Sequence, residues 1–293
     1  MCDACALADT LLDAAGEFAL RRPLTDHEAV HGDIPRIAAD FDAAELAVAK
    51  AAAPVVTKLV RQLLEEVGPL LKKHDLAGIS RVSPSYVAEL ATALSGGMSK
   101  ATKAGRAQVA DAHGKYHIRL AGARNDVSKA EAYLAGRSVL SAQQLADAMA
   151  ARVRAAAVQA AVKGETEWTD EEVAALEDGS TQTLAGFAMN LAREAYGVGR
   201  SLAMTDVADD ITTLTYSAVL DNSTCDTCAA ADGDLYSDDA SMDPAGSIED
   251  GIAACPNPDC EGMAYGNVCR CVCIADFSSG GQAINPSNGG DDG

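Results

Sequence analysis

The sequence has few aromatic residues and no long uninterrupted apolar run. Aromatic residues make up 4% of the 293 residues, although 48% are hydrophobic and much of that share is alanine. Alanine-rich chains suit long helices that pack closely through small side chains, rather than a sheet-rich core of valine, isoleucine and phenylalanine. No run of about 18 apolar residues is present, so we expect no contact with a membrane. These absences predict a mainly helical protein.

Basic residues are almost absent from the C-terminal part of the chain. From Thr205 to Gly293 there are 17 acidic residues and a single basic one, Arg270, so this part carries a net charge of -16 out of a total of -20. Such a charge repels phosphates, and direct binding of nucleic acid through this part is not expected. The same acidity favours a bound cation.

Several motifs of catalysis and targeting are missing. The sequence has no P-loop, no dinucleotide-binding fingerprint and no Gly-x-Ser-x-Gly elbow. Its first residues, Met1-Cys2-Asp3-Ala4-Cys5, lack the positive start of a secretory signal, and the run that follows is broken by acidic residues. We therefore expect synthesis in a reducing cytoplasm, where clustered cysteines are metal ligands more often than disulfides. An oxidised, secreted domain is the alternative.

Long alanine-rich helices are expected between residues 39 and 204, four or five in number. One is indicated by apolar residues at helical spacing, namely Val56, Leu59, Val60, Leu63, Leu64 and Val67. Capping patterns at Ser83-Pro84, at Ser141 with Gln144 and at Thr169 with Glu172 predict the starts of others. Expected ends or breaks lie at Pro54, Gly68-Pro69, Gly96-Gly97 and Gly179.

The sequence changes character after Met204. Residues 211–220 are rich in β-branched side chains and predict a strand, and 234–236 and 268–277 predict two further short strands around a loop-like segment. We thus expect an N-terminal arm at 1–38, a helical body at 39–204, a small α+β module at 205–277 and a disordered tail at 278–293.

Most of the cysteines belong to this C-terminal module. Cys225 and Cys228 form a C-x-x-C pair, and Cys269 with Cys271 forms a second short pair about forty residues later. Two such pairs can close a four-sulfur tetrahedral zinc site that stabilises a small, loop-rich fold. Zinc held by four sulfurs is structural, because no coordination position is left for water or substrate. Three more cysteines, Cys255, Cys260 and Cys273, compete for the ligand positions.

Other candidate ligands are weaker. Cys2 and Cys5 also form a C-x-x-C pair, but without partners we interpret them as part of a mobile terminus. His113 and His117 have the i, i+4 spacing of a helical metal pair, but no glutamate follows His113, so we expect surface histidines.

The cysteine-bearing sequence resembles a known family. The run from Tyr216 to Gly233 contains Asp221-Asn-Ser-Thr-Cys225-Asp-Thr-Cys228 and is closed by Cys269-Arg-Cys271. It is similar to the C-terminal domain of phage Mu F-type minor head, or head morphogenesis, proteins, which show a strand, an Asp-x-x-Thr-Cys-x-x-Cys turn and a final His-Pro-x-Cys-Arg-Cys. The helix before it, ending at Arg193-Glu-Ala-Tyr-Gly-Val-Gly-Arg200, also looks like the family's helix. The resemblance covers residues 185–276.

The resemblance implies a function and one question about the ligands. It implies a minor capsid protein without enzymatic activity, which acts in head assembly with the portal protein and other head proteins; self-association is left open. Its location would be the host cytoplasm during assembly and then the virion, in the capsid interior or at the portal vertex.

The family's histidine falls at Gly266, so Cys255 or Cys260 is expected to replace it at zinc. We rank Cys225, Cys228 and Cys269 first as ligands, Cys260 and Cys271 next, then Cys255, with Cys273 last.

A function of a different class is the alternative hypothesis. Acidic residues of the module, such as Asp221 and Asp232, could serve a metal-dependent hydrolase or nuclease. That hypothesis predicts loss of activity on replacing either aspartate with folding intact.

Overall fold

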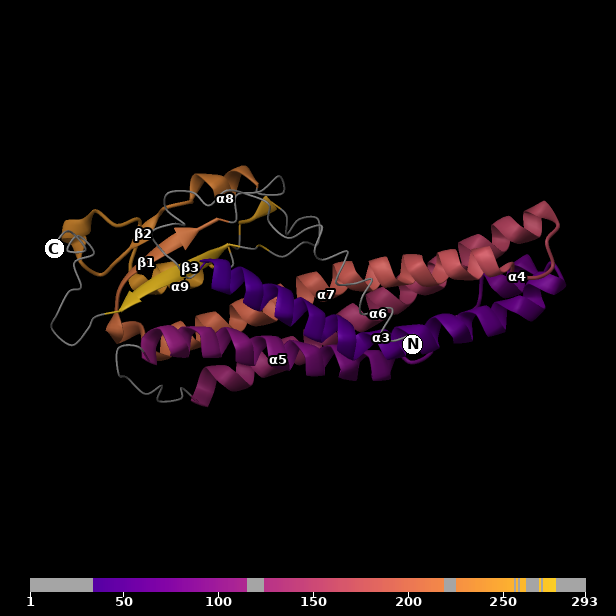
Figure 1. The fold of residues 1–293 in the computed structure, drawn as a ribbon, viewed down its shortest axis with the longest axis horizontal. Coiled ribbons are helices and arrows are strands. Elements are labelled where there is room, and N and C mark those ends of the chain that lie inside the picture. Colours follow the sequence, from indigo (N-terminus) through magenta and orange to yellow (C-terminus); the bar gives the residue numbers. More distant parts are fainter. Residues whose placement is uncertain are drawn as a thin grey trace, which may run out of the picture. The chain divides into compact units, whose positions relative to one another are not determined.

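A computed structural model describes residues 34–114, 124–218, 225–255, 257, 259–261, 269 and 271–277. In these residues the protein is mainly helical, with a small three-stranded sheet near the C-terminal end, as the sequence predicts (Figure 1). The predicted arm and tail lie almost entirely outside the described residues. None of the described helices is both long enough and apolar enough to cross a membrane.

The described chain forms two units. The first contains residues 38–101 and 128–196, and the second contains 34–37, 102–114, 124–127 and the described residues from 197 onward. Helices α5 (Val87–Gly114) and α7 (Asp170–Asp206) therefore contribute residues to both units. The two units are described separately below.

The first unit is built from long helices that run alongside one another (Figure 1). It contains most of α3 (Ile34–Lys72), the short α4 (Leu76–Ile79), and large parts of α5, of α6 (Arg124–Lys163) and of α7. Buried alanine and leucine residues line the contacts, with Ala52, Leu59 and Leu145 fully buried. The single tryptophan, Trp168, packs against Leu71, Ala160 and Ala161.

The sequence predicts a kink or a new helix at Pro54 and an end or a bend at Gly68-Pro69, and the structure shows that no helix starts or ends at these positions. Helix α3 continues through both Pro54 and Pro69 to Lys72. A proline inside a helix costs about 3 kcal/mol, because one backbone hydrogen bond is lost and the ring clashes with the preceding turn. Around Pro54, the neighbours Ala53, Val55 and Val56 are all buried, so packing of this face outweighs the cost.

Two helices also continue through glycines at which the sequence predicts an end or a break. Helix α5 passes through Gly96 and Gly97, and a Cβ atom on Gly97 would lie 2.7 Å from Cα of Val48. This glycine therefore allows α3 and α5 to approach closely, a role that the sequence pattern does not distinguish from helix termination. Helix α7 likewise continues through Gly179.

Of the two capping boxes, one is confirmed. The Thr169 hydroxyl accepts a hydrogen bond from the Glu172 backbone N–H at 3.2 Å, and the Glu172 carboxylate accepts one from the Thr169 N–H at 2.9 Å. Helix α7 begins at the next residue, Asp170. The other box is wrong, because Ser141 lies buried in the middle of α6.

The second unit contains an antiparallel sheet with strand order β2-β1-β3. Strand β1 (Ile211–Ser217) pairs with β2 (Leu235–Tyr236) on one side and with β3 (Val272–Phe277) on the other. All three lie within the strands predicted from the sequence. Helix α9 (Ile248–Ala253) packs on β1 and β2, where Gly251 leaves room for the ring of Tyr236.

Candidate metal centre

Five cysteines converge at one end of the sheet. Cys225 is the N-cap of the short helix α8 (Asp226–Ala230), and Cys228 lies buried inside it. Cys269 and Cys271 directly precede β3, and Cys260 comes from the segment between α9 and β3. The sulfurs of Cys225, Cys228 and Cys260 all lie within 4.8 Å of one another, as do those of Cys228, Cys269 and Cys271. This cluster could hold a metal ion, with Cys228 common to both groups.

The sulfur separations match those of a tetrahedral centre. The Sγ atoms of Cys225 and Cys260 are 3.7 Å apart, and those of Cys228 and Cys269 are also 3.7 Å apart. With Zn–S bonds of about 2.3 Å, two sulfurs of a regular tetrahedron lie about 3.8 Å apart. Each of these two separations matches one edge of such a site, although the sulfurs of Cys225, Cys260 and Cys269 are not all within 4.8 Å of one another.

The first cysteine pair is positioned by the end of β1. The carboxylate of Asp232 accepts a hydrogen bond from the Ala218 N–H at 2.8 Å, and the Gly233 N–H donates to the Tyr216 carbonyl at 2.9 Å. Gly233 has φ of +92°, which glycine adopts without strain. These bonds return the chain to β1 after α8, so that Cys228 is held beside the end of the strand.

The second pair is positioned by the register of the sheet. Tyr216 lies opposite Cys273 and Ser217 lies opposite Val272. Because the two strands are antiparallel, the residues that precede β3 lie where β1 ends. Cys269 and Cys271 thus lie at the same end of the sheet as Cys225 and Cys228, although about forty residues separate the two pairs in the sequence.

Backbone donors favour the thiolate at Cys225. The Cys228 N–H donates to the Cys225 sulfur and lowers the pKa of that thiol, and the Glu261 N–H adds to the effect. Cys228 itself is buried, and burial raises the pKa of its thiol to about 12. A bound cation counteracts this rise in the pKa, because it stabilises the thiolate directly.

Cys269 is the second cysteine whose surroundings favour the negatively charged thiolate. The Cys271 thiol donates to its sulfur and lowers the pKa of Cys269, whereas the same hydrogen bond and burial raise the pKa of Cys271. The Asn257 amide also lies 3.8 Å from the Cys228 sulfur. Burial raises the pKa of Tyr216, whose hydroxyl lies next to Cys271 and Cys228. Donors of this kind orient and stabilise metal-bound thiolates.

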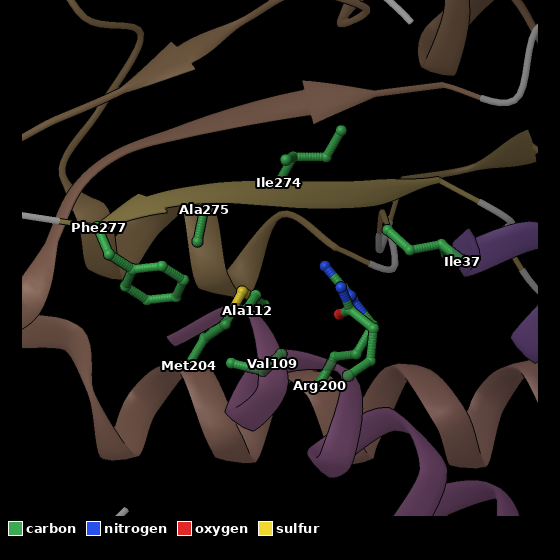
Figure 2. Close-up of a pocket in the computed structure, with 9 residues that line it drawn as sticks. Ile37, Val109, Ala112, Arg200, Met204, Ile274, Ala275 and Phe277 are labelled. Carbon is green, nitrogen blue, oxygen red and sulfur yellow. The ribbon is translucent and has the colours of Figure 1, made fainter. Parts of the chain in front are cut away.

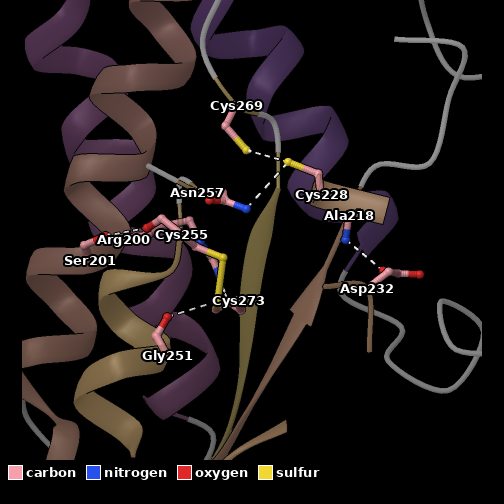
Figure 3. Close-up of a disulfide and its surroundings, with 10 residues drawn as sticks. All are labelled: Arg200, Ser201, Ala218, Cys228, Asp232, Gly251, Cys255, Asn257, Cys269 and Cys273. Carbon is pink, nitrogen blue, oxygen red and sulfur yellow. Dashed lines mark hydrogen bonds between the residues drawn. A yellow bond between two sulfur atoms is a disulfide. The ribbon is translucent and has the colours of Figure 1, made fainter. Parts of the chain in front are cut away.

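Cys255 and Cys273 take a different role, because they form a disulfide with a Cα–Cα distance of 5.9 Å (Figure 3). The bond connects the residues after α9 to β3, and the Cys273 sulfur lies 3.1 Å from the Gly251 carbonyl oxygen. Of the two cysteines expected to replace the histidine, the structure therefore places Cys260 in the cluster and Cys255 outside it. Gly266 lies outside the described residues.

Of the remaining candidates, only Asp232 and His113 belong to the described part of the chain, and neither is among the residues grouped in the cluster. Asp232 is occupied by its hydrogen bond to the backbone of Ala218, and Asp221, Cys2, Cys5 and His117 lie outside the described residues. The expectation of a surface histidine at position 113 is wrong. His113 is fully buried, where its Nε2 lies 3.2 Å from the Asp210 carboxylate and its ring meets Phe277 edge-on.

A small pocket is lined by residues of α3, α5, α7 and β3 (Figure 2). Its walls are mainly apolar, with Met204, Ile274 and Phe277 among them, and its polar lining residues are Gln108 and Arg200. The Arg200 guanidinium donates to the Cys273 carbonyl at 2.6 Å, so it fixes β3 to α7. The described residues that line this pocket include no carboxylate, histidine or cysteine, and we assign no chemistry to it.

Comparisons with known proteins identify no relative. No family model, no curated protein and no solved structure matches the chain.

Proposed function

We propose that the protein is a minor capsid protein of a tailed phage, in which a structural zinc ion stabilises the C-terminal unit. The observation that supports the proposal is the 3.7 Å separation between the sulfurs of Cys228 and Cys269. These two residues belong to the two motifs that carry the resemblance to phage head morphogenesis proteins. Two motifs distant in sequence thus share one site, as expected if both serve one metal ion.

Zinc is the ion that these ligands favour. All five candidate donors are cysteine sulfurs, which select zinc or iron among common biological metals. Once four sulfurs are bound, no position remains for water, so the ion stabilises the fold and does not activate a nucleophile. The unit needs such support, because its sheet has only three strands, one of which contains two residues.

The role in head assembly follows from the resemblance and from the form of the first unit. Long helices suit a protein that binds other proteins through helix faces. We propose that the partners are the portal protein and other head proteins, that binding takes place in the host cytoplasm during assembly, and that the protein then remains in the virion.

Two measurements on the full-length chain test the proposal. Elemental analysis of protein purified without added metal is expected to give about one zinc ion per chain. Co-purification with the portal protein encoded by the same genome is expected, whereas the portal protein of an unrelated phage serves as the control. Absence of metal would overturn the zinc assignment, and equal retention of both portal proteins, or of neither, would overturn the assembly role.

A further inference from the structure

The Cys255–Cys273 disulfide closes a loop that carries part of the cysteine cluster. Its two cysteines are 18 residues apart in the sequence. Three cysteines of the cluster lie between them in the sequence, namely Cys260, Cys269 and Cys271. The other two come before the loop and belong to the region of α8: Cys225 and Cys228. A metal ion bound by both groups therefore joins the disulfide-closed loop to α8.

Both ends of this loop are held by the rest of the second unit. The Cys255 carbonyl accepts a hydrogen bond from the Ser201 hydroxyl at 3.1 Å, and the Cys273 carbonyl accepts one from Arg200 at 2.6 Å (Figure 3). Both donors belong to α7. Cys255 is 6% exposed and Cys273 is 0% exposed. The disulfide is therefore a fixed, buried point from which the loop begins.

Asn257 connects this fixed point to the cluster. It comes two residues after Cys255, and its side-chain amide lies 3.8 Å from the Cys228 sulfur (Figure 3). Its carbonyl accepts a hydrogen bond from the Cys260 N–H at 3.2 Å. The position of Cys260 thus depends on a short path that starts at the disulfide and passes through Asn257.

Cys269 and Cys271 are positioned differently, by the sheet. They directly precede β3, whose register with β1 is set by pairing of the two strands. Backbone hydrogen bonds hold such a pair together and do not require the disulfide. Of the three sulfurs inside the loop, that of Cys260 is therefore the one whose position depends most on the disulfide.

Opening the disulfide should weaken metal binding. Ordering a chain segment around an ion costs conformational entropy, and a ligand that is already held in place avoids that cost. With the bond closed, both ends of the loop are fixed, so Cys260 has few other conformations to lose. With two free thiols, the residues after α9 are no longer joined to β3, and the ion must order them when it binds.

We propose that the Cys255–Cys273 pair is a redox control of the metal site, in which the disulfide holds Cys260 at the cluster and reduction weakens metal binding. A dithiol reductant supplies two electrons and two protons, the S–S bond breaks to give two thiols, and the dithiol becomes a disulfide. The charge of the ion does not change. The inference rests on the proposed zinc site and adds a regulation to it. The reducing host cytoplasm favours the open pair, so zinc binding tightens once the chain is in oxidising surroundings.

Competition for zinc between the full-length chain and a chromophoric chelator tests the proposal. The measurement is made with the pair oxidised and, in the absence of oxygen, after reduction by a phosphine, which leaves no added thiol to bind zinc. We expect reduction to weaken zinc binding about tenfold, within the usual range for coupling between two sites. The zinc content of purified protein should not change, because a structural site stays saturated after a loss of this size.

Two variants separate the disulfide from other effects of the reductant. Cys255→Ser cannot form the bond, so its zinc affinity should match that of the reduced wild-type chain and should not respond to the phosphine. Cys260→Ser should bind zinc more weakly and respond to reduction by less than about twofold, because the sulfur that the loop positions is gone. Circular dichroism and Trp168 emission check that both variants are folded.

Linkage provides a reciprocal measurement. If the oxidised chain binds zinc tenfold more tightly, zinc must lower the reduction potential of the pair by about 30 mV. The zinc-loaded chain and the metal-free chain are equilibrated in glutathione buffers of graded composition. Alkylation followed by mass spectrometry then counts the free thiols at Cys255 and Cys273.

The possible outcomes separate this inference from the zinc assignment on which it rests. Equal zinc affinity of the oxidised and reduced wild-type chain would overturn the redox control and leave the zinc site in place. A tenfold response that persists in Cys260→Ser would contradict the role of the loop, and a reduction potential that zinc does not change would contradict the coupling. A chain that fails to compete for zinc in either state would remove both the zinc assignment and the redox control.

Discussion

At the level of single residues, the seven C-terminal cysteines separate into two kinds. Cys225, Cys228, Cys260, Cys269 and Cys271 gather their sulfurs at one end of the sheet, whereas Cys255 and Cys273 are joined by a disulfide. The sequence predicted the region and the two short-spaced pairs, because those spacings are local. It ranked Cys260 before Cys255 but did not predict the disulfide between Cys255 and Cys273, because that pairing depends on where the residues after α9 lie beside β3.

The division between the cysteines can be tested with serine variants. We expect Cys260→Ser to lose at least half of the bound metal, because it removes a sulfur that lies 3.7 Å from Cys225. Cys255→Ser, five residues earlier, should retain the full amount. The measurement is metal content by mass spectrometry on protein purified in parallel. Retention of metal by Cys260→Ser together with its loss from Cys255→Ser would reverse the assignment.

The disulfide should stabilise the protein only under oxidising conditions. A bond that closes a loop of 18 residues contributes about 3 kcal/mol in the chain-entropy description. We therefore expect Cys255→Ser to lower the free energy of unfolding by about 2–4 kcal/mol without reductant. With excess reductant, the variant and the wild-type chain should differ by less than about 1 kcal/mol. Urea unfolding with and without reductant measures both values. If the variant and the wild-type chain differ by the same amount in both conditions, the disulfide is not the cause of the difference.

At the level of elements, the sequence predicted more of the strands than of the helix ends. All three strands fall inside predicted ranges, because β-branched side chains between turn residues are a local pattern. The helix breaks were wrong at Pro54 and Gly97 because tertiary packing decides there. Gly97 is needed where α3 passes close by, and nothing in its own neighbourhood in the sequence indicates that contact.

Thr169 begins α7 and provides a test at this level. Thr169→Ala removes the hydroxyl that accepts the Glu172 N–H, so we expect a loss of about 1 kcal/mol in the free energy of unfolding. Ser141→Ala is the comparison, because the same pattern at Ser141 lies inside α6 and caps nothing. Thermal unfolding should show a larger fall in Tm for the Thr169 variant. An equal fall for both would contradict the capping role.

The contribution of the Thr169–Glu172 capping box to the free energy of unfolding should depend on pH. Hydrogen bonding from the Thr169 N–H lowers the pKa of Glu172 below its usual 4.5. A depressed pKa in the folded state stabilises the protein above the pKa of the unfolded state, and the contribution is lost as the pH falls through the folded value. Thr169→Ala keeps the N–H donor but removes the hydroxyl that also donates to the Glu172 carboxylate at 3.0 Å, so the part of the stability difference that this bond contributes should shrink at pH values below about 4.

At the level of the whole molecule, the fluorescence of a single residue can report on the folding of the first unit. Trp168 is the single tryptophan and packs against Leu71, Ala160 and Ala161 in the first unit. The cysteine cluster lies in the second unit. Fluorescence of Trp168 and the reactivity of the cysteines therefore follow the two units separately.

Metal removal should act on the second unit first. We expect a strong chelator to expose the thiols of the cluster to a thiol reagent and to remove the near-ultraviolet signal of Tyr216 and Tyr236. Trp168 emission should stay unchanged, and most of the helical circular dichroism should remain. Loss of the Trp168 signal in step with thiol exposure would show that the first unit also depends on the ion.

The order of strands in the sheet also sets the order of events during synthesis. β1 is the central strand, yet its partner β3 begins 55 residues after the end of β1. While the ribosome makes those residues, one edge of β1 stays open, and an open edge readily pairs with other chains. The last sulfurs of the cluster, at Cys269 and Cys271, emerge immediately before β3. We therefore expect capture of an ion and closure of the sheet to be a single late step, so that metal supply at that moment affects how much of the newly made chain escapes aggregation.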